Sequence, residues 1–79
     1  MNTAKDIPME NVTSSQIAAI GYCPESKTLR VRFTGKGSTY DYANVPPEVH
    51  KGLMEAKSVG RYFGENIRGN AKFPHTRLP

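Results

Sequence analysis

The sequence predicts an α+β fold: a three-stranded antiparallel β-meander packed on one face by a C-terminal helical hairpin. The first half of the chain alternates apolar and polar residues between short turns, which is the period of β-strands. The second half repeats apolar residues every three or four positions, which is the period of amphipathic helices. The 79 residues allow a single domain with a small core.

The predicted strands cover residues 15–22, 28–34 and 38–43. The first is apolar on both faces, as is typical of a central strand. The second alternates, with Arg30 and Arg32 on the face opposite its apolar side chains. Short turns at residues 23–27 and 35–37 connect the strands, so neighbours in the sequence should pair as a meander.

The third strand places Tyr40 and Tyr42 two residues apart, so both rings share one face. On an open sheet face, such a pair is a candidate platform for stacking bases. The alternative is that both rings pack beneath the helices. We favour this second interpretation because so small a domain needs its aromatic residues for the core. Arg30 and Arg32 would then occupy the open face.

The helical hairpin is expected to begin at Pro46-Pro47, because proline is tolerated in the first turn of a helix. The first helix should cover residues 48–56, and Ser58 is a suitable N-cap for the second. Gly69-Asn70 should end the second helix. The predicted core consists of Ile17 or Ile20, Leu29, Val31, Phe33, Tyr40, Tyr42, Val49, Leu53, Phe63 and Ile67.

The polar and proline-containing ends are expected to lie outside the folded domain. We assign residues 1–11 to a flexible lead-in, 12–70 to the domain, and 71–79 to an extended basic tail. The net charge of +4 is concentrated in residues 57–79, which carry five Lys or Arg residues against Glu65 alone. Such a one-sided basic region attracts phosphate, although it also serves to keep a small protein soluble.

Residue types suited to catalysis or metal binding are few. Cys23 is the only cysteine and His50 and His75 are the only histidines, without the spacing of a zinc site. A Cys–His nucleophile pair stays open at this stage, but no motif supports it. We therefore expect no catalysis, no metal and no cofactor. A single cysteine and the lack of an apolar run of about 20 residues favour a cytoplasmic protein without membrane association.

A series of short motifs over residues 12–70 resembles the KTSC domain family. These motifs contain Val12, Ser14, Ser15, Ile20, Gly21, Tyr22, Leu29, Val31, Phe33, Tyr40, Tyr42, Val45, Pro46, Ala56, Ser58, Gly60, Tyr62, Phe63, Ile67 and Arg68. Cys23 departs from the pattern, which favours an acidic or polar turn residue there. The family is named after a C-terminal extension of some lysyl-tRNA synthetases and also occurs as stand-alone bacterial and phage proteins. The resemblance implies an association with RNA.

The leading hypothesis is a non-catalytic module that binds RNA or another nucleic acid through a basic surface. Its candidate residues are Arg30, Arg32, Lys57, Arg61, Arg68 and Lys72. Ser58 and Gly60, at the start of the second helix, form a candidate anion site because helix N-termini attract negative charge. Two alternatives stay open: a protein-interaction module using the open sheet face or a strand edge, and a binder of a nucleotide-like ligand.

Overall fold

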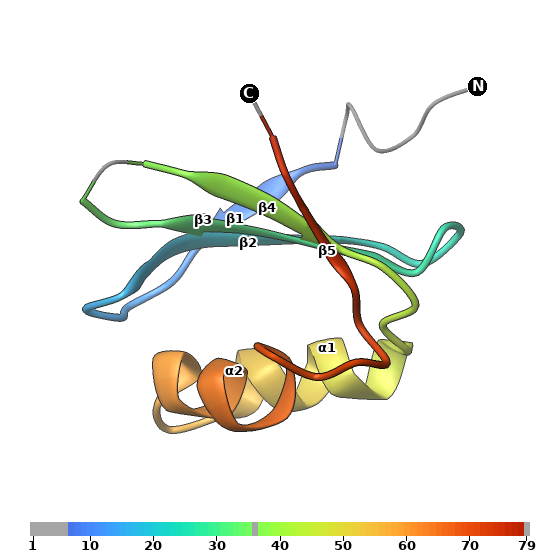
Figure 1. The fold of residues 1–79 in the computed structure, drawn as a ribbon. Coiled ribbons are helices and arrows are strands. Elements are labelled where there is room, and N and C mark those ends of the chain that lie inside the picture. Colours follow the sequence, from blue (N-terminus) through green and yellow to red (C-terminus); the bar gives the residue numbers. More distant parts are fainter. Residues whose placement is uncertain (1–6, 36, 79) are drawn as a thin grey trace.

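The protein folds as one antiparallel sheet with two helices packed against one of its faces (Figure 1). The computed structural model describes residues 7–35 and 37–78. The elements, in chain order, are β1 (Met9–Asn11), β2 (Ile17–Cys23), β3 (Thr28–Phe33), β4 (Thr39–Tyr42), α1 (Pro47–Glu55), α2 (Val59–Asn66) and β5 (His75–Arg77). The strands pair in sequence order, β1-β2-β3-β4-β5. The predicted α+β class, antiparallel sheet and two helices are confirmed.

The predicted number of strands was wrong, because the sheet has five strands rather than three. The additional strands, β1 and β5, are three-residue edge strands from the segments that we assigned to the lead-in and the tail. Backbone hydrogen bonds attach them to β2 and β4, and their mostly exposed side chains show no apolar alternation. Residues 1–6 of the expected lead-in, Lys36 of the expected hairpin loop and Pro79 lie outside the described residues.

The register of the strands decides which side chains face the helices. Leu29 lies opposite Tyr42, and Val31 lies opposite Tyr40, so both tyrosines share a face with the buried residues of β3. Tyr42 is only 4% exposed and packs in the core, whereas Tyr40 is half-buried at its edge. Arg30 lies on the opposite face of the sheet, which we call the outer face.

The main core lies between the sheet and the helices, where Phe63 contacts the rings of Phe33 and Tyr42 edge-on. We predicted that either Ile17 or Ile20 would be buried, and both are. Three other predicted core residues, Phe33, Tyr40 and Val49, are only half-buried. The core also contains Val45 and Phe73, which are absent from our predicted set.

The outer face is partly covered by the chain that leads into β1. A Cβ atom at Gly21 would lie 2.6 Å from Ile7 Cγ2 and 2.6 Å from the carbonyl oxygen of Pro8. Glycine at this position therefore leaves room for Ile7 and Pro8 to pack against the outer face of β2. Among the described residues, neither helix is long and apolar enough to cross a membrane.

Candidate nucleic-acid interface

Three cationic side chains of the predicted site line one open groove of about 750 Å³. This basic groove runs between residues 13–16, which precede β2, and one side of α2 together with the residues just before and after it. Its cations are Lys57, Arg61 and Arg68. The structure thus brings together half of the six basic residues that the sequence suggested for phosphate contact.

The polar side of the basic groove is held in a defined shape by local hydrogen bonds. Ser14 Oγ accepts hydrogen bonds from the backbone N–H groups of Gln16 and Ile17, at 3.2 and 3.3 Å. Thr34 Oγ1 donates to the Ser15 carbonyl oxygen at 2.8 Å, which attaches this segment to the end of β3. The groove wall is therefore preorganised before any ligand arrives.

The two residues of the candidate anion site, Ser58 and Gly60, both line the basic groove. Ser58 Oγ accepts a hydrogen bond from the Arg61 N–H at 3.3 Å, as an N-cap does. A Cβ atom at Gly60 would lie 3.1 Å from Ser14 Oγ, so glycine allows α2 to approach the wall of the groove closely.

One acidic side chain reduces the positive charge of the basic groove. Glu65 accepts a 3.1 Å ion-pair hydrogen bond from Arg61 Nε, one helical turn earlier, and it also lines the groove. Both side chains are largely exposed, at 78% for Arg61 and 60% for Glu65, so water screens this pair and an incoming phosphate can compete for the arginine.

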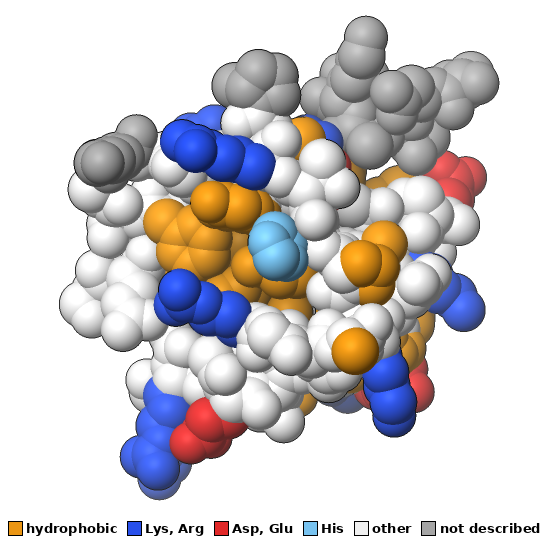
Figure 2. All heavy atoms as spheres, in the orientation of Figure 1, with side chains coloured by type: hydrophobic (Ala, Val, Ile, Leu, Met, Phe, Trp, Pro, Cys, Tyr) orange, Lys and Arg blue, Asp and Glu red, His pale blue; other side chains and the backbone are white. Residues whose placement is uncertain are grey.

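A second depression, of about 480 Å³, opens beside the basic groove. We call it the aromatic hollow, because it is lined by Phe33, Tyr40, Tyr42 and His75. Arg68 lines both depressions and therefore lies where they meet. Figure 2 shows apolar side chains gathered around a histidine on the face of the molecule near β4 and β5, with Lys or Arg side chains on two sides.

The rings of the aromatic hollow contact one another in edge-on or tilted arrangements. The Tyr40 and His75 ring centroids are 5.6 Å apart with the planes at 61°, and Tyr42 lies 5.6 Å from His75 at 37°. The Phe33 ring lies 5.7 Å from Tyr40. Burial raises the pKa of the Tyr42 hydroxyl, while the positive charge of Arg68 opposes this shift.

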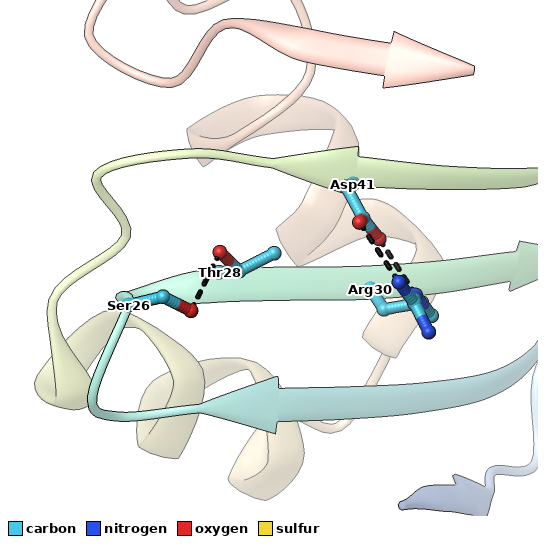
Figure 3. Close-up of polar contacts among 4 residues, drawn as sticks. All are labelled: Ser26, Thr28, Arg30 and Asp41. Carbon is cyan, nitrogen blue, oxygen red and sulfur yellow. Dashed lines mark hydrogen bonds and ion pairs between the residues drawn. The ribbon is translucent and has the colours of Figure 1, made fainter. Parts of the chain in front are cut away.

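The other basic residues proposed from the sequence lie elsewhere. Arg30 donates two hydrogen bonds to the Asp41 carboxylate on the outer face, from Nε at 2.7 Å and from Nη2 at 3.0 Å (Figure 3). Arg32 is exposed on that same face, and Lys72 is exposed after α2. None of these residues lines the basic groove or the aromatic hollow.

The sheet separates the cysteine from both histidines. Tyr22 stacks on His50 with centroids 4.7 Å apart, and neighbouring residues of a strand alternate faces, so Cys23 lies on the outer face. His75 lies opposite Tyr42, on the helix side. Within residues 7–35 and 37–78, no group of three His, Cys, Asp or Glu side chains is placed to hold a metal ion.

Sequence reasoning missed His75, Phe33 and Ser14 as residues of the two depressions. His75 was assigned to a tail, because nothing in residues 75–77 signals a strand. Phe33 was treated only as a core residue. A useful signal for Ser14 was its position three residues before the first buried strand residue, where a hydroxyl can accept backbone N–H groups.

A small five-stranded antiparallel sheet with two helices on one face defines the architectural class of the protein. The chain belongs to the KTSC domain family, whose model matches residues 13–73. The crystal structure of a KTSC domain protein from Yersinia pestis superimposes with a TM-score of 0.85 and 37% identity, covering 92% of this chain and 99% of that one.

Two relatives show where such domains occur. A protein of Tsukamurella paurometabola is 52% identical over 60 residues, covering 76% of this chain and 88% of the relative. A lysine–tRNA ligase of Nostoc punctiforme is 36% identical over 66 residues, covering 84% of this chain and 12% of the ligase. The domain therefore has a counterpart within a much larger protein that is named for a tRNA substrate.

Proposed function

We propose that this protein is a non-catalytic module that binds RNA through the basic groove. The observation that carries the proposal is the convergence of Lys57, Arg61 and Arg68 on one preorganised groove in which, among the described residues, a single carboxylate lies, that of Glu65. Positive side chains gathered along a groove track the phosphates of a nucleic acid strand.

The kind of nucleic acid is inferred from the relatives. A domain similar over 84% of this chain occurs in a lysine–tRNA ligase, so RNA is the first polymer to test. That inference is by association, and the basic groove supplies the physical argument for binding. In this proposal Arg30 stabilises the sheet through Asp41 rather than contacting phosphate.

Binding can be tested by fluorescence anisotropy with a labelled 12-nucleotide RNA of mixed sequence, titrated at several salt concentrations. Three phosphate contacts predict a slope of about −2 when the logarithm of the binding constant is plotted against the logarithm of the salt concentration. Each cation-to-alanine change in the groove should make this slope less steep by about 0.7. Lys51→Ala is the matched control, because Lys51 is exposed on α1 and lines neither depression.

Arg32→Ala tests the outer face in the same assay, because Arg32 is the exposed arginine of β3. It should leave the affinity and the salt slope unchanged. If instead Arg32→Ala reduces the slope and the groove variants do not, the outer face is the interface and the groove proposal fails.

The ion pair between Arg61 and Glu65 provides a change that should strengthen binding. Glu65→Gln removes the negative charge that Glu65 contributes to the groove, where no other described residue is acidic, and releases Arg61 for phosphate. We expect about a two- to fivefold increase in affinity at low salt, which disappears at high salt. Unchanged affinity at low salt would mean that RNA does not follow this groove.

A pull-down of the tagged protein from cell extract, with and without nuclease, tests for a protein partner. A thermal-shift assay tests for a small ligand. A protein partner that survives both nuclease and high salt would replace the RNA proposal with a protein-interaction module. A thermal shift with mononucleotides in the absence of polymer binding would support a binder of a nucleotide-like ligand.

A further inference from the structure

We infer that the aromatic hollow receives one unpaired base of a single-stranded RNA whose phosphates follow the basic groove. This inference rests on the proposed function and deepens it, because it specifies the form of RNA that is bound. The site combines the half-buried ring of Tyr40 with His75, which belongs to an edge strand that only the folded chain reveals.

The chemistry of the aromatic hollow suits a nucleobase. Four aromatic side chains line it, and its volume of about 480 Å³ lies within the range of small-molecule sites. The half-buried ring of Tyr40 projects from β4 and contacts the rings of Phe33 and His75, so stacking a base on it orders few additional groups. Ser38, on the same rim, carries a hydroxyl that can donate to or accept from a base edge.

The charges around the aromatic hollow also suit an RNA strand. Arg68 lines it, and Arg77 lies directly opposite Tyr40 in the β4–β5 pair, hence on the same face of the sheet. Among the described residues that line the hollow, none is acidic. A nucleotide whose base enters the hollow would thus have Arg68 and Arg77 nearby to contact its own phosphate and that of its neighbour.

Arg68 connects the two parts of the site, because it lines both the basic groove and the aromatic hollow. A strand in the groove that contacts Arg68 through a phosphate would place its neighbouring base over the hollow. In a duplex the faces of the bases are covered by stacking, so only an unpaired base can enter. The arrangement therefore predicts a preference for single strands, which the basic groove alone would not confer.

The first experiment compares a labelled single-stranded RNA with a blunt-ended RNA duplex of the same length, which has no unpaired base, by anisotropy at the same salt. We expect the single strand to bind at least about tenfold more tightly. Tyr40→Leu keeps an apolar side chain but removes the ring, and it should weaken the single strand by about 5- to 150-fold. Tyr40→Phe keeps the ring and should bind within about twofold of the wild type.

The matched control is Tyr62→Leu, because Tyr62 is also half-buried but packs against Gly52 of α1, away from the hollow. It should leave the single-strand affinity unchanged. Circular dichroism on every variant shows whether it is folded. Equal effects of Tyr40→Leu and Tyr62→Leu in folded proteins would overturn the inference.

Photo-crosslinking of the unmodified protein keeps the inference testable if Tyr40→Leu does not fold. An RNA that carries 5-iodouridine at one position should crosslink to the peptides that contain Phe33, Tyr40 or His75, as located by mass spectrometry. A crosslink only to peptides outside both depressions would overturn the inference.

Failure of the inference differs from failure of the proposed function. Equal binding of the single strand and the duplex, with the groove variants still reducing the steepness of the salt dependence, would leave an RNA-binding groove without a base site. No binding of either RNA would overturn both proposals.

Discussion

Arg30 and Asp41 form a two-point ion pair across β3 and β4, with hydrogen bonds of 2.7 and 3.0 Å. Both side chains are well buried, at 12% and 15% exposure. A planar guanidinium bound at two points to a carboxylate is more rigid and stronger than a surface pair. The pair therefore fixes the register of the two strands, and it occupies an arginine that the sequence alone suggested for phosphate binding.

Removal of one partner of this pair should destabilise the fold without changing the affinity for RNA. We expect Asp41→Asn to lower the free energy of unfolding by about 1–3 kcal/mol, because a buried charge-assisted hydrogen bond is lost. Urea denaturation of Asp41→Asn, Arg30→Gln and the double variant forms a cycle that isolates the pair. Additive single effects would show that the two residues do not stabilise the fold as a pair.

Two glycines should respond to alanine in opposite directions. At Gly21 a Cβ atom would lie 2.6 Å from both Ile7 Cγ2 and the Pro8 carbonyl oxygen, so Gly21→Ala should cost about 1–3 kcal/mol. At Gly64, in α2, nothing lies within 4 Å, so Gly64→Ala should stabilise the fold by about 0.5–1 kcal/mol. Thermal unfolding of the two variants checks both predictions. A Gly21→Ala protein as stable as the wild type would mean that Ile7 and Pro8 do not pack on β2.

Phe63 should be the side chain on which the core most depends. It is 2% exposed and contacts both Phe33 and Tyr42 edge-on. Phe63→Ala should cost about 3–5 kcal/mol, a large share of the stability of so small a domain. Phe63→Leu, the conservative control, should cost less than about 1.5 kcal/mol. Similar denaturation midpoints for the two variants would contradict this account of the core.

Stability should fall with acidification through the ordinary pKa of histidine, in part because of His50. Burial of the ring lowers the pKa of His50 from 6.5, although the negative charge of Glu10 opposes this shift. The unfolded chain therefore binds a proton more readily than the folded protein, so the contribution of His50 to stability is fully present above about pH 6.5 and is lost progressively as the pH falls below it.

His50→Gln isolates this contribution, because His75 and every carboxylate are retained. We expect the variant to lose less unfolding free energy than the wild type between pH 7.5 and pH 5.5, as measured by urea denaturation. An identical loss in the two proteins would show that His50 is protonated as readily in the folded protein as in the unfolded chain.

Much of the fold could be predicted because local patterns report on it directly. The alternation in β3 and the cap at Ser58 mark elements whose side chains interact with near neighbours. The edge strands could not be predicted, since backbone hydrogen bonds to β2 and β4 hold them while their side chains remain mostly exposed. A strand of this kind has no signature in its residue types.

In the candidate site, too, contacts between near neighbours in the chain could be predicted and contacts between distant segments could not. Arg61 and Glu65 lie one helical turn apart in α2, so their contact could be predicted from spacing, whereas Asp41 gave no indication that it would bind Arg30.

By itself, the sequence determined the class of fold, the two helices and the central strands, since these depend on periods and caps over a few residues. Only the tertiary structure decided that His75 lies beside Tyr40 and that Arg68 borders both the groove and the hollow. The physical reason is that such contacts join residues far apart in the chain, and the packing of the helices on one sheet face selects which of them meet.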